Sequence, residues 1–312
     1  MTSADLLQEN VKGHPMTHPR LAPPHKILLA TDLSCRCDRA LDRAVQLAKE
    51  WQAELIAAYV VDPDQSRQYR FDRTPASWRR LPSPVERMRW RLKRDLGTSA
   101  EFIRVIVEEG PPGETLLSIA AREGCDLIVT GIARDETLGR MILGNTVNRL
   151  VRGSPVPVLI VHDRALGAYR SIVVATDFSE ASLQALLTTS ALFPGRDLTL
   201  FHAYDVPFSG LLDERDYVRN LRTMEKELGA KFLSDERVDT AVRASADVII
   251  EHGTPGRLLA DYVENEHADL TVIGSHGRGV LFDALIGSTA QSLIESLEGD
   301  LLVVHYRPGK GQ

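Results

Sequence analysis

The nine residues KILLATDLS, from Lys26 to Ser34, recur further along the chain as SIVVATDFS, from Ser171 to Ser179. The aspartates of the two copies, Asp32 and Asp177, are 145 positions apart. Each copy is a short apolar run that ends in Ala-Thr-Asp, and such a run is typical of a strand buried on both faces of a parallel sheet. The stretch therefore predicts two copies of a fold that opens with a buried strand.

The repetition extends over most of the 312 residues. The segment EEGPPGETLLSIAAREGCDLIVTG at 108–131 matches EHGTPGRLLADYVENEHADLTVIG at 251–274, and the ends of the two copies, VPVLIVH and DLLVVH, keep the same offset of 143. Landmarks that keep their order and spacing indicate a duplication. We expect a flexible N-terminal tail over residues 1–24, a first domain over 25–163 and a second domain over 169–307.

Apolar runs alternate in each copy with segments of helical periodicity, such as ALDRAVQLAKEW at 40–51. Strands separated by helices predict a parallel sheet with right-handed crossovers. The expected fold class is α/β, with two tandem open twisted sheets that are mainly parallel and five-stranded and carry helices on both faces. The final strands of the two copies are expected to pair edge to edge, because an exposed apolar edge has to be covered.

The composition is 43% hydrophobic and 26% charged, and no apolar run approaches the roughly 20 residues that a membrane span needs. The N-terminus lacks the apolar core of a secretory signal, and three cysteines give no disulfide framework, so a cytoplasmic protein is expected. Residues 1–162 hold 23 basic and 20 acidic residues, and residues 163–312 hold 14 and 23. Neither half is basic enough to predict a nucleic-acid surface, so we expect no nucleic-acid and no membrane partner.

A glycine-rich stretch, GSHGRGVLFDALIGST at 274–289, follows the predicted fourth strand of the second copy. Glycines allow close approach of another group, and backbone N–H groups that lead into a helix can hold an anion. An ordinary strand-to-helix turn is the alternative. Ligands of open parallel sheets bind outside the carboxyl ends of the strands, so this loop and Asp177 are expected to meet there.

Three features together resemble the universal stress protein family in its tandem two-domain form: ATD after the first strand, GTPG after the third, and Gly-x2-Gly-x9-Gly-Ser after the fourth. The resemblance implies a fold like that of the adenine nucleotide alpha hydrolases, with ATP, alone or with Mg²⁺, across the strand ends. By position it places Asp177 at the ribose or at the edge of the nucleotide, and Ala203 against the adenine. Around the phosphates it places Gly274, Gly277, Gly287, Ser288 and Thr289.

The first copy departs from this pattern. Its loop, GIARDETLGRMILGNT at 131–146, has Arg134 in place of the second glycine and Asn145 in place of the serine. The Arg134 side chain either fills the space of a phosphate or neutralises one; we favour the first, and expect weak or no nucleotide binding there. The corresponding, weaker site residues are Asp32, Val60, Gly131, Gly144 and Asn145.

We therefore expect a stress-response regulatory protein that binds ATP in the second repeat, with slow or no hydrolysis. No general base is evident, so we assign no catalytic residue and expect at most weak ATPase activity or autophosphorylation. One alternative is a nucleotide-free scaffold of the same fold; a less favoured one is an ATP-dependent transferase, since ATDLS stands where a HIGH-type motif would be. The expected partners are an adenine nucleotide, a second copy of the chain and an unidentified regulatory protein.

Two cysteines, Cys35 and Cys37, precede the first predicted helix, where the helix dipole can lower a thiol pKa. An accidental pair is the favoured reading, and no Cys/His spacing resembles a metal-ligand set. The histidines that end or lie within strands, His162, His202 and His305, are expected to be structural. His276, inside the glycine loop, is read as a solvent-facing residue.

An arginine-rich segment with Trp78 and Trp90 precedes the third strand of the first copy. RNA binding is one reading of this composition. We favour a solvated helix face, because Ser83 and Pro84 predict a helix start. Behind that start an apolar stripe is formed by Val85, Met88, Leu92 and Leu96.

Overall fold

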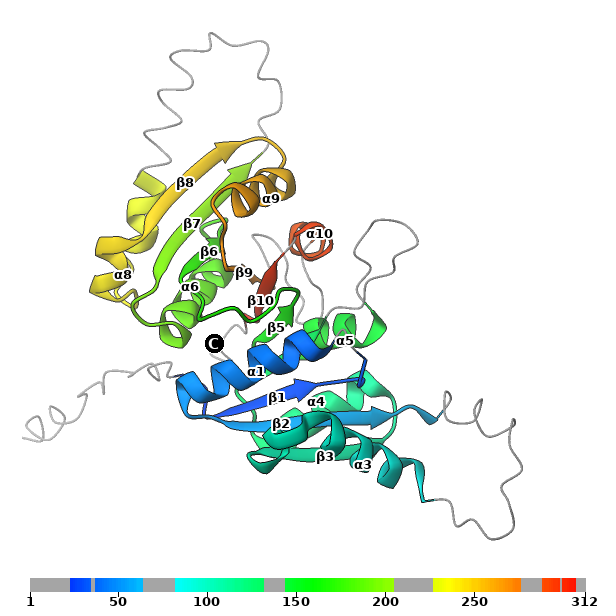
Figure 1. The fold of residues 1–312 in the computed structure, drawn as a ribbon. Helices are drawn as coiled ribbons and strands as arrows, with labels where there is room; N and C mark the ends of the chain where they lie inside the picture. Colours follow the sequence, from blue (N-terminus) through cyan, green and yellow to red (C-terminus); the bar gives the residue numbers. More distant parts are fainter. Residues whose placement is uncertain are drawn as a thin grey trace, which may run out of the picture.

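The structure is a computed structural model that describes residues 23–34, 37–63, 82–131, 144–204, 227–275, 288–297 and 299–306 (Figure 1). The first repeat contains, in order, β1 (Lys26–Ala30), α1 (Asp38–Trp51), β2 (Glu54–Val61), α3 (Pro84–Leu96), the short 3-10 helix η2 (Gly97–Glu101), β3 (Ile103–Glu109), α4 (Pro112–Glu123), β4 (Leu127–Gly131), α5 (Asn145–Gly153) and β5 (Val158–Val161).

The second repeat follows the same order. It contains β6 (Ser171–Ala175), α6 (Glu180–Leu192), β7 (Asp197–Tyr204), a helical segment at 227–233, α8 (Thr240–Ser245), β8 (Asp247–His252), α9 (Pro255–Asn265), β9 (Leu270–Gly274), α10 (Ser288–Ser296) and β10 (Asp300–Val304).

The strands form one ten-stranded sheet in the order β3-β2-β1-β4-β5-β10-β9-β6-β7-β8. All pairs within a repeat are parallel, whereas β5 and β10 pair antiparallel, with Leu159 opposite Leu302. The α/β fold class and the edge-to-edge pairing of the last strands are thus confirmed. The two five-stranded sheets are joined through this central pair (Figure 1).

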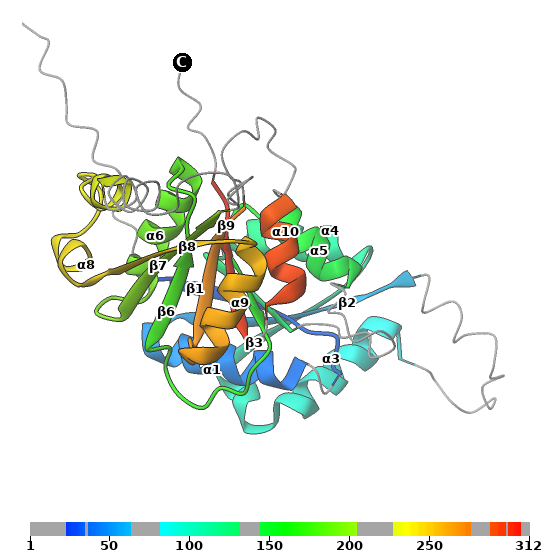
Figure 2. The same cartoon turned by 90° about the horizontal axis from the view of Figure 1, so that it is seen from above.

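Helices cover both faces of the sheet. The buried side chains of α1, α3 and α6 belong to one hydrophobic core, and those of α4, α5, α9 and α10 belong to the other. Both cores contain residues of both repeats. On the second face α5 and α10 lie side by side (Figure 2), where Arg152 Nη2 donates to Gln291 Oε1 at 3.1 Å. The repeats therefore share their packing as well as their sheet.

The start of the first strand in each repeat is held by the same type of hydrogen bond, from backbone N–H groups to an aspartate carboxylate. Asp126 Oδ2 accepts hydrogen bonds from the backbone N–H groups of His25 and Lys26, at 2.9 and 3.0 Å. Asp269 Oδ2 accepts from those of Arg170 and Ser171, at 2.7 and 3.0 Å. The duplication seen in the sequence is thus reproduced in individual hydrogen bonds.

A buried ion pair at the junction has no such counterpart. Arg43 Nε of α1 lies 3.2 Å from Asp300 Oδ2 at the start of β10, with only 5% and 0% of the two side chains exposed. Asp300 Oδ1 also accepts from the backbone N–H groups of His162 and Asp163, at 2.8 and 2.9 Å, and Tyr169 donates its hydroxyl to Oδ2. The group connects the first repeat, the linker and the second repeat.

Candidate functional site

The strands that end at the candidate site are neighbours in the sheet. In the second repeat β6 pairs with β9 on one side and with β7 on the other. Asp177 follows β6 by two residues, Gly274 is the last residue of β9, and Ala203 is near the end of β7. The chain leaves β6 toward β7 and returns to β9, so the ends of β6 and β9 form a topological switch point, where open α/β sheets bind ligands. The structure brings these three residues to one edge.

The turn at Asp177 is fixed by local hydrogen bonds. Phe178 has a left-handed backbone, with φ 58°, and its N–H donates to Thr176 Oγ1 at 2.9 Å. Ser179 N–H donates to Asp177 Oδ1 at 3.1 Å. Ser179 then caps α6, because its hydroxyl accepts from Ser182 N–H at 3.3 Å. The half-buried Asp177 is therefore held in one place at the edge of the sheet.

His202 of β7 supports this turn from the side. Its Nδ1 lies 2.6 Å from the carbonyl oxygen of Thr176, and its ring centroid lies 4.8 Å from that of Phe178. The ring of Tyr204 stacks beyond it at 5.4 Å. These contacts agree with the structural role expected for His202.

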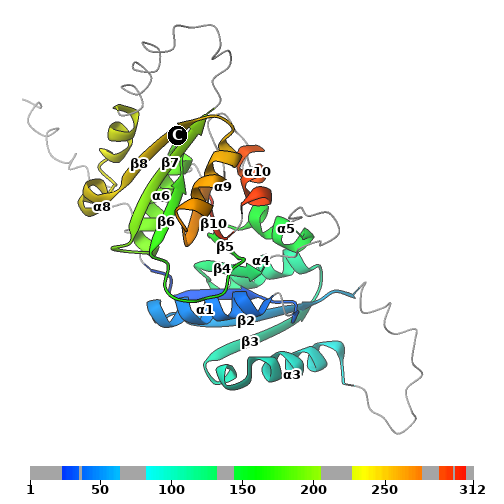
Figure 3. The ribbon, with the colours of Figure 1, turned by 45° about the horizontal axis from the view of Figure 1, so that its top comes forward.

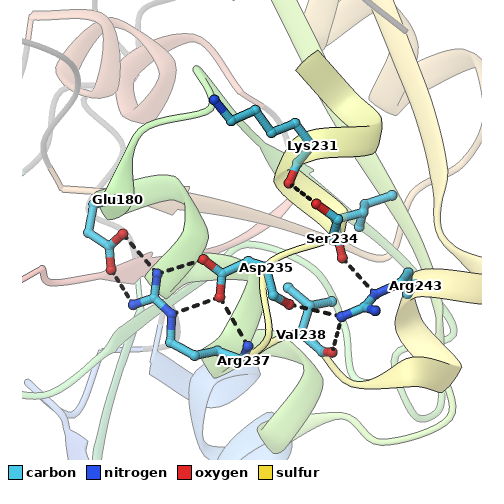
Figure 4. Close-up of polar contacts among 8 residues, drawn as sticks. Glu180, Lys231, Ser234, Asp235, Arg237, Val238 and Arg243 are labelled. Atoms are coloured by element: carbon cyan, nitrogen blue, oxygen red, sulfur yellow. Dashed lines mark hydrogen bonds and ion pairs between the residues drawn. The ribbon is translucent and has the colours of Figure 1, made fainter. Parts of the chain in front are cut away.

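An ion-pair group that the sequence did not reveal holds the start of α6 (Figure 4). The Arg237 guanidinium binds both carboxylate oxygens of Glu180, at 2.5 and 3.0 Å, and also binds Asp235. Hydrogen bonding to Arg237 lowers the pKa of Asp235. Arg243 donates to the carbonyl oxygens of Leu233 and Asp235, both at 2.9 Å. The segment between the helix at 227–233 and α8 is thus fixed against the helix that follows Asp177.

Gly274 lies where no side chain fits without a shift. A Cβ atom at this position would lie 3.1 Å from the carbonyl oxygen and 3.2 Å from the carbonyl carbon of Ala181, in the first turn of α6. Beyond β9, α10 is described from Ser288 onward. The helix α10 connects β9 to β10, which are parallel, so it starts at the edge of the sheet where the carboxyl ends of the strands lie. Its N-terminal N–H groups therefore lie at the same edge as Asp177.

The first repeat has the same turn with fewer supports. Leu33 has φ 61°, its N–H donates to Thr31 Oγ1 at 3.1 Å, and Asp32 Oδ1 accepts from Ser34 N–H at 2.9 Å. Desolvation of the Asp32 carboxyl by neighbouring atoms opposes its ionisation, but hydrogen bonds from Ser34 and Cys37 outweigh this effect and lower its pKa. Tyr59 stands where the second repeat has His202, and the described residues supply no side-chain bond to the Thr31 carbonyl. Asp32 is exposed, unlike Asp177.

The remaining residues of the weaker site are also placed. Val60 is buried in β2, and Gly131 is the last residue of β4. Gly144 is the N-cap of α5 and Asn145 its first residue, and Gly144 provides no side-chain cap. Val60, Gly131 and Asn145 thus correspond in strand or helix position to Ala203, Gly274 and Ser288 of the second repeat.

Several predictions fall outside the described residues. These concern Gly277, Gly287, Arg134, His276, Cys35 and Trp78. Ser288 and Thr289 begin α10, but their side chains are also outside the description. The loops themselves therefore enter the proposals below through the sequence alone.

The suggestion that the helix dipole lowers the pKa of the Cys37 thiol is wrong. Burial raises it from 9.0 to about 11, and the neighbouring Asp32 carboxylate adds to the shift. The thiol Sγ lies 3.1 Å from Asp32 Oδ1 and donates its hydrogen to it. A protonated thiol that serves as a donor is not an activated nucleophile.

Cys37 should therefore react slowly with iodoacetamide in the native protein at pH 8. With a pKa of about 11 instead of 9.0, its thiolate fraction falls about 100-fold, and the alkylation rate should fall with it. Peptide mapping by mass spectrometry measures this site separately from the other cysteines. The same protein in urea is the control, in which Cys37 should react at an ordinary rate; equal rates in both states would contradict the assignment.

Known proteins resemble the chain over almost its whole length. The sequence profile of the Universal stress protein family matches residues 24–162 and 168–305. Universal stress protein MJ0531 of Methanocaldococcus jannaschii is 32% identical over 142 residues, 44% of this chain and 81% of that protein. Universal stress protein Rv2005c of Mycobacterium tuberculosis is 23% identical over 309 residues, 92% and 99% of the two chains.

Solved structures share the fold. The functionally unknown protein PA1789 of Pseudomonas aeruginosa superposes with a TM-score of 0.63 at 20% identity, over 90% of this chain and 92% of that chain. A universal stress protein of Archaeoglobus fulgidus superposes with a TM-score of 0.55 at 19% identity, over 90% and 98%. Among the helices of the described ranges, none has the length and hydropathy to cross a membrane.

Proposed function

Because the chain belongs to the universal stress protein family, we propose that it is a regulatory protein of the stress response that binds ATP in its second repeat, with slow or no hydrolysis. Its output would be read by a partner protein that distinguishes the nucleotide-bound form. A homodimer and a cytoplasmic location stay predictions.

The asymmetry between the two strand-end sites carries this proposal. In the second repeat the aspartate is half-buried, and its turn is held by His202 and by the Glu180–Arg237 ion pair. The first repeat has an exposed Asp32 at the matching place. In sequence, the glycine pattern is complete in the second repeat alone. A fixed site loses less conformational entropy when a ligand binds, which favours the second repeat.

The proposed roles rest on the family resemblance and on the positions of Asp177, Ala203 and Gly274 at the strand ends. The Asp177 carboxylate would accept hydrogen bonds from the ribose hydroxyls, and Ala203, which has a small side chain, would leave room for the adenine. Backbone N–H groups at the start of α10 would face the phosphates, with the helix dipole behind them. That phosphate cradle comprises Gly274, Gly277, Gly287, Ser288 and Thr289.

Replacing Asp177 with alanine should remove most ATP binding, whereas Asp32→Ala should leave it unchanged. Loss of hydrogen bonds to a charged group costs about 1.5–3 kcal/mol, or about 10-fold to 150-fold in Kd. Calorimetric titration of ATP into the full-length chain measures the affinity and the stoichiometry, for which we expect one ATP per chain. Asp32 is the matched control, because it follows the same strand in the same type of turn.

A third variant, Gly277→Arg, copies Arg134 into the second loop and should also abolish binding. Two ATP per chain in the unmodified protein, with one lost in each aspartate variant, would contradict the single-site proposal. No binding at millimolar ATP would instead favour a nucleotide-free scaffold of the same fold.

A further inference from the structure

The outer face of α3 carries an exposed tryptophan among cations. The helix begins where Ser83 and Pro84 predicted, with a capping box formed by Ser83 and Glu86, and it packs on the sheet through Leu92 and Leu96, which are 1% and 5% exposed. At about 100° per residue, Trp90 lies on the side opposite these leucines. Its side chain is 63% exposed, the largest exposure of any described aromatic residue. The predicted solvated face is therefore basic and aromatic together.

The charges of this face are not neutralised within the described residues. The helix contains five basic and two acidic residues. Glu86 is used in the capping box, where its carboxylate accepts from Ser83 N–H at 2.8 Å. None of the cations forms an ion pair with a residue of the described ranges; they are Arg87, Arg89, Arg91, Lys93 and Arg94. All five are exposed, in a chain whose net charge is −6.

Trp90 is arranged as an anchor within this basic face. The Arg94 guanidinium lies over its ring, 4.7 Å from the centroid, one helical turn away. Tryptophan and arginine are the residue types that carry most binding energy at protein interfaces. The position is also open, because α3 lies at the outer end of the first repeat beside the edge strand β3, away from the second repeat (Figure 3).

The spacing of the cations on α3 and the convex shape of the helix indicate what kind of partner fits. Arg87 and Arg91, like Arg89 and Lys93, are four residues apart, so each pair presents cations one helical turn apart. Glutamates four residues apart on another helix have the same separation. A convex helix packs against a helix, whereas single-stranded nucleic acid is usually held in a groove. The aliphatic residues of α3 pack against the core, so Trp90 stands among cations and the helix has no continuous apolar face to insert into a membrane.

We propose that the outer face of α3, centred on Trp90, is a docking surface for an acidic helix of a partner protein. Carboxylates of that helix pair with the arginines, and an apolar side chain packs on the Trp90 ring. The surface is independent of the nucleotide site, so it stands whether or not the second repeat binds ATP.

A synthetic 21-residue helical peptide tests the proposal, with glutamates at every fourth position, leucines beside them and a fluorescein label. Fluorescence anisotropy with the full-length protein measures its affinity. We expect micromolar binding that Trp90→Ala weakens about tenfold or more and that the double variant Arg87→Glu, Arg91→Glu abolishes. Arg257→Glu is the matched control, because Arg257 is an 82% exposed arginine on a helix of the second repeat, and this variant should bind normally.

Two other ligands test the alternative occupants of this surface. A labelled 15-mer of uridine represents single-stranded RNA, and vesicles that contain phosphatidylserine represent an anionic membrane. Tighter, Trp90-dependent binding of the oligonucleotide or of the vesicles than of the peptide would overturn the proposal. So would a peptide that fails to bind, or one whose affinity is the same for Trp90→Ala and the unmodified protein. Because Trp90 is mostly exposed, its replacement should leave the thermal unfolding midpoint unchanged, which the same samples can show.

Discussion

Replacing Asp300 with alanine should lower the free energy of unfolding by about 3–5 kcal/mol, the cost of leaving one charge of a buried pair without its partner. Arg43 would remain with 5% of its side chain exposed and no carboxylate beside it. The backbone N–H groups of His162 and Asp163 and the hydroxyl of Tyr169 would also lose their acceptor. Urea unfolding followed by circular dichroism measures the change.

The surroundings of Asp300 explain why the loss should be large. Burial first, and then the charge of Asp300, raise the pKa of Tyr169 well above its ordinary range, so its hydroxyl stays protonated and donates to the carboxylate. The Arg43 guanidinium also lies 4.0 Å from the centre of the Tyr169 ring and donates to the Gly167 carbonyl at 2.7 Å. Arg43, Tyr169 and Asp300 therefore contact one another, and the loss of Asp300 leaves both of the others without its carboxylate.

Two further variants separate the buried charge from the packing around it. Asp163→Ala removes the exposed carboxylate of a linker residue that keeps its backbone N–H bond to Asp300, and should change the stability by about 0.5 kcal/mol or less. The double variant Arg43→Leu, Asp300→Leu removes both charges and should be more stable than Asp300→Ala, since it leaves no unpaired ion in the core. An Asp300→Ala protein within about 1 kcal/mol of the unmodified one would contradict the proposed role of the cluster.

The sequence predicted features that both repeats share. The Ala-Thr-Asp ends of the first strands and the pairing of β5 with β10 follow from the duplication of an α/β domain whose last edge strand must be covered. Local chemistry was equally readable at α3, where Ser83 and Pro84 mark the helix start. These features depend on residues that are neighbours in the chain or on the internal repeat, and both can be read from the amino-acid sequence.

Contacts that only one repeat makes could not be read in this way. Position 157, which matches Asp300 in the first repeat, is a proline, so comparison of the copies gives no hint of the buried ion pair. Arg237 and Glu180 are 57 residues apart and meet only because the chain folds back over the start of α6. The raised pKa of the Cys37 thiol could not be predicted for a related reason, since it depends on burial, although it agrees with the favoured interpretation of an accidental cysteine pair.

The second large effect is expected at the end of β9. Gly274→Ala should lower the free energy of unfolding by about 1–3 kcal/mol, the usual cost of forcing an extra methyl group into a packed core. The new Cβ would lie 3.1 Å from the Ala181 carbonyl oxygen and 3.2 Å from its carbon. These are backbone atoms of a helix that cannot rotate away as a side chain would. The measurement is the same urea unfolding, together with ATP titration, because α6 and the Asp177 turn have to move with Ala181.

Gly167→Ala is the matched control, because a Cβ there meets nothing within 4 Å. Where glycine is not needed, alanine reduces the entropy of the unfolded chain and stabilises a protein by about 0.4–1 kcal/mol. The two substitutions should therefore change stability in opposite directions, which a general effect of glycine replacement cannot produce. If Gly274→Ala is as stable as the unmodified protein, α6 can withdraw from β9 without cost, and the close approach is not what requires glycine. If stability falls but ATP affinity does not, the contact supports the fold and the Asp177 turn is held independently of it.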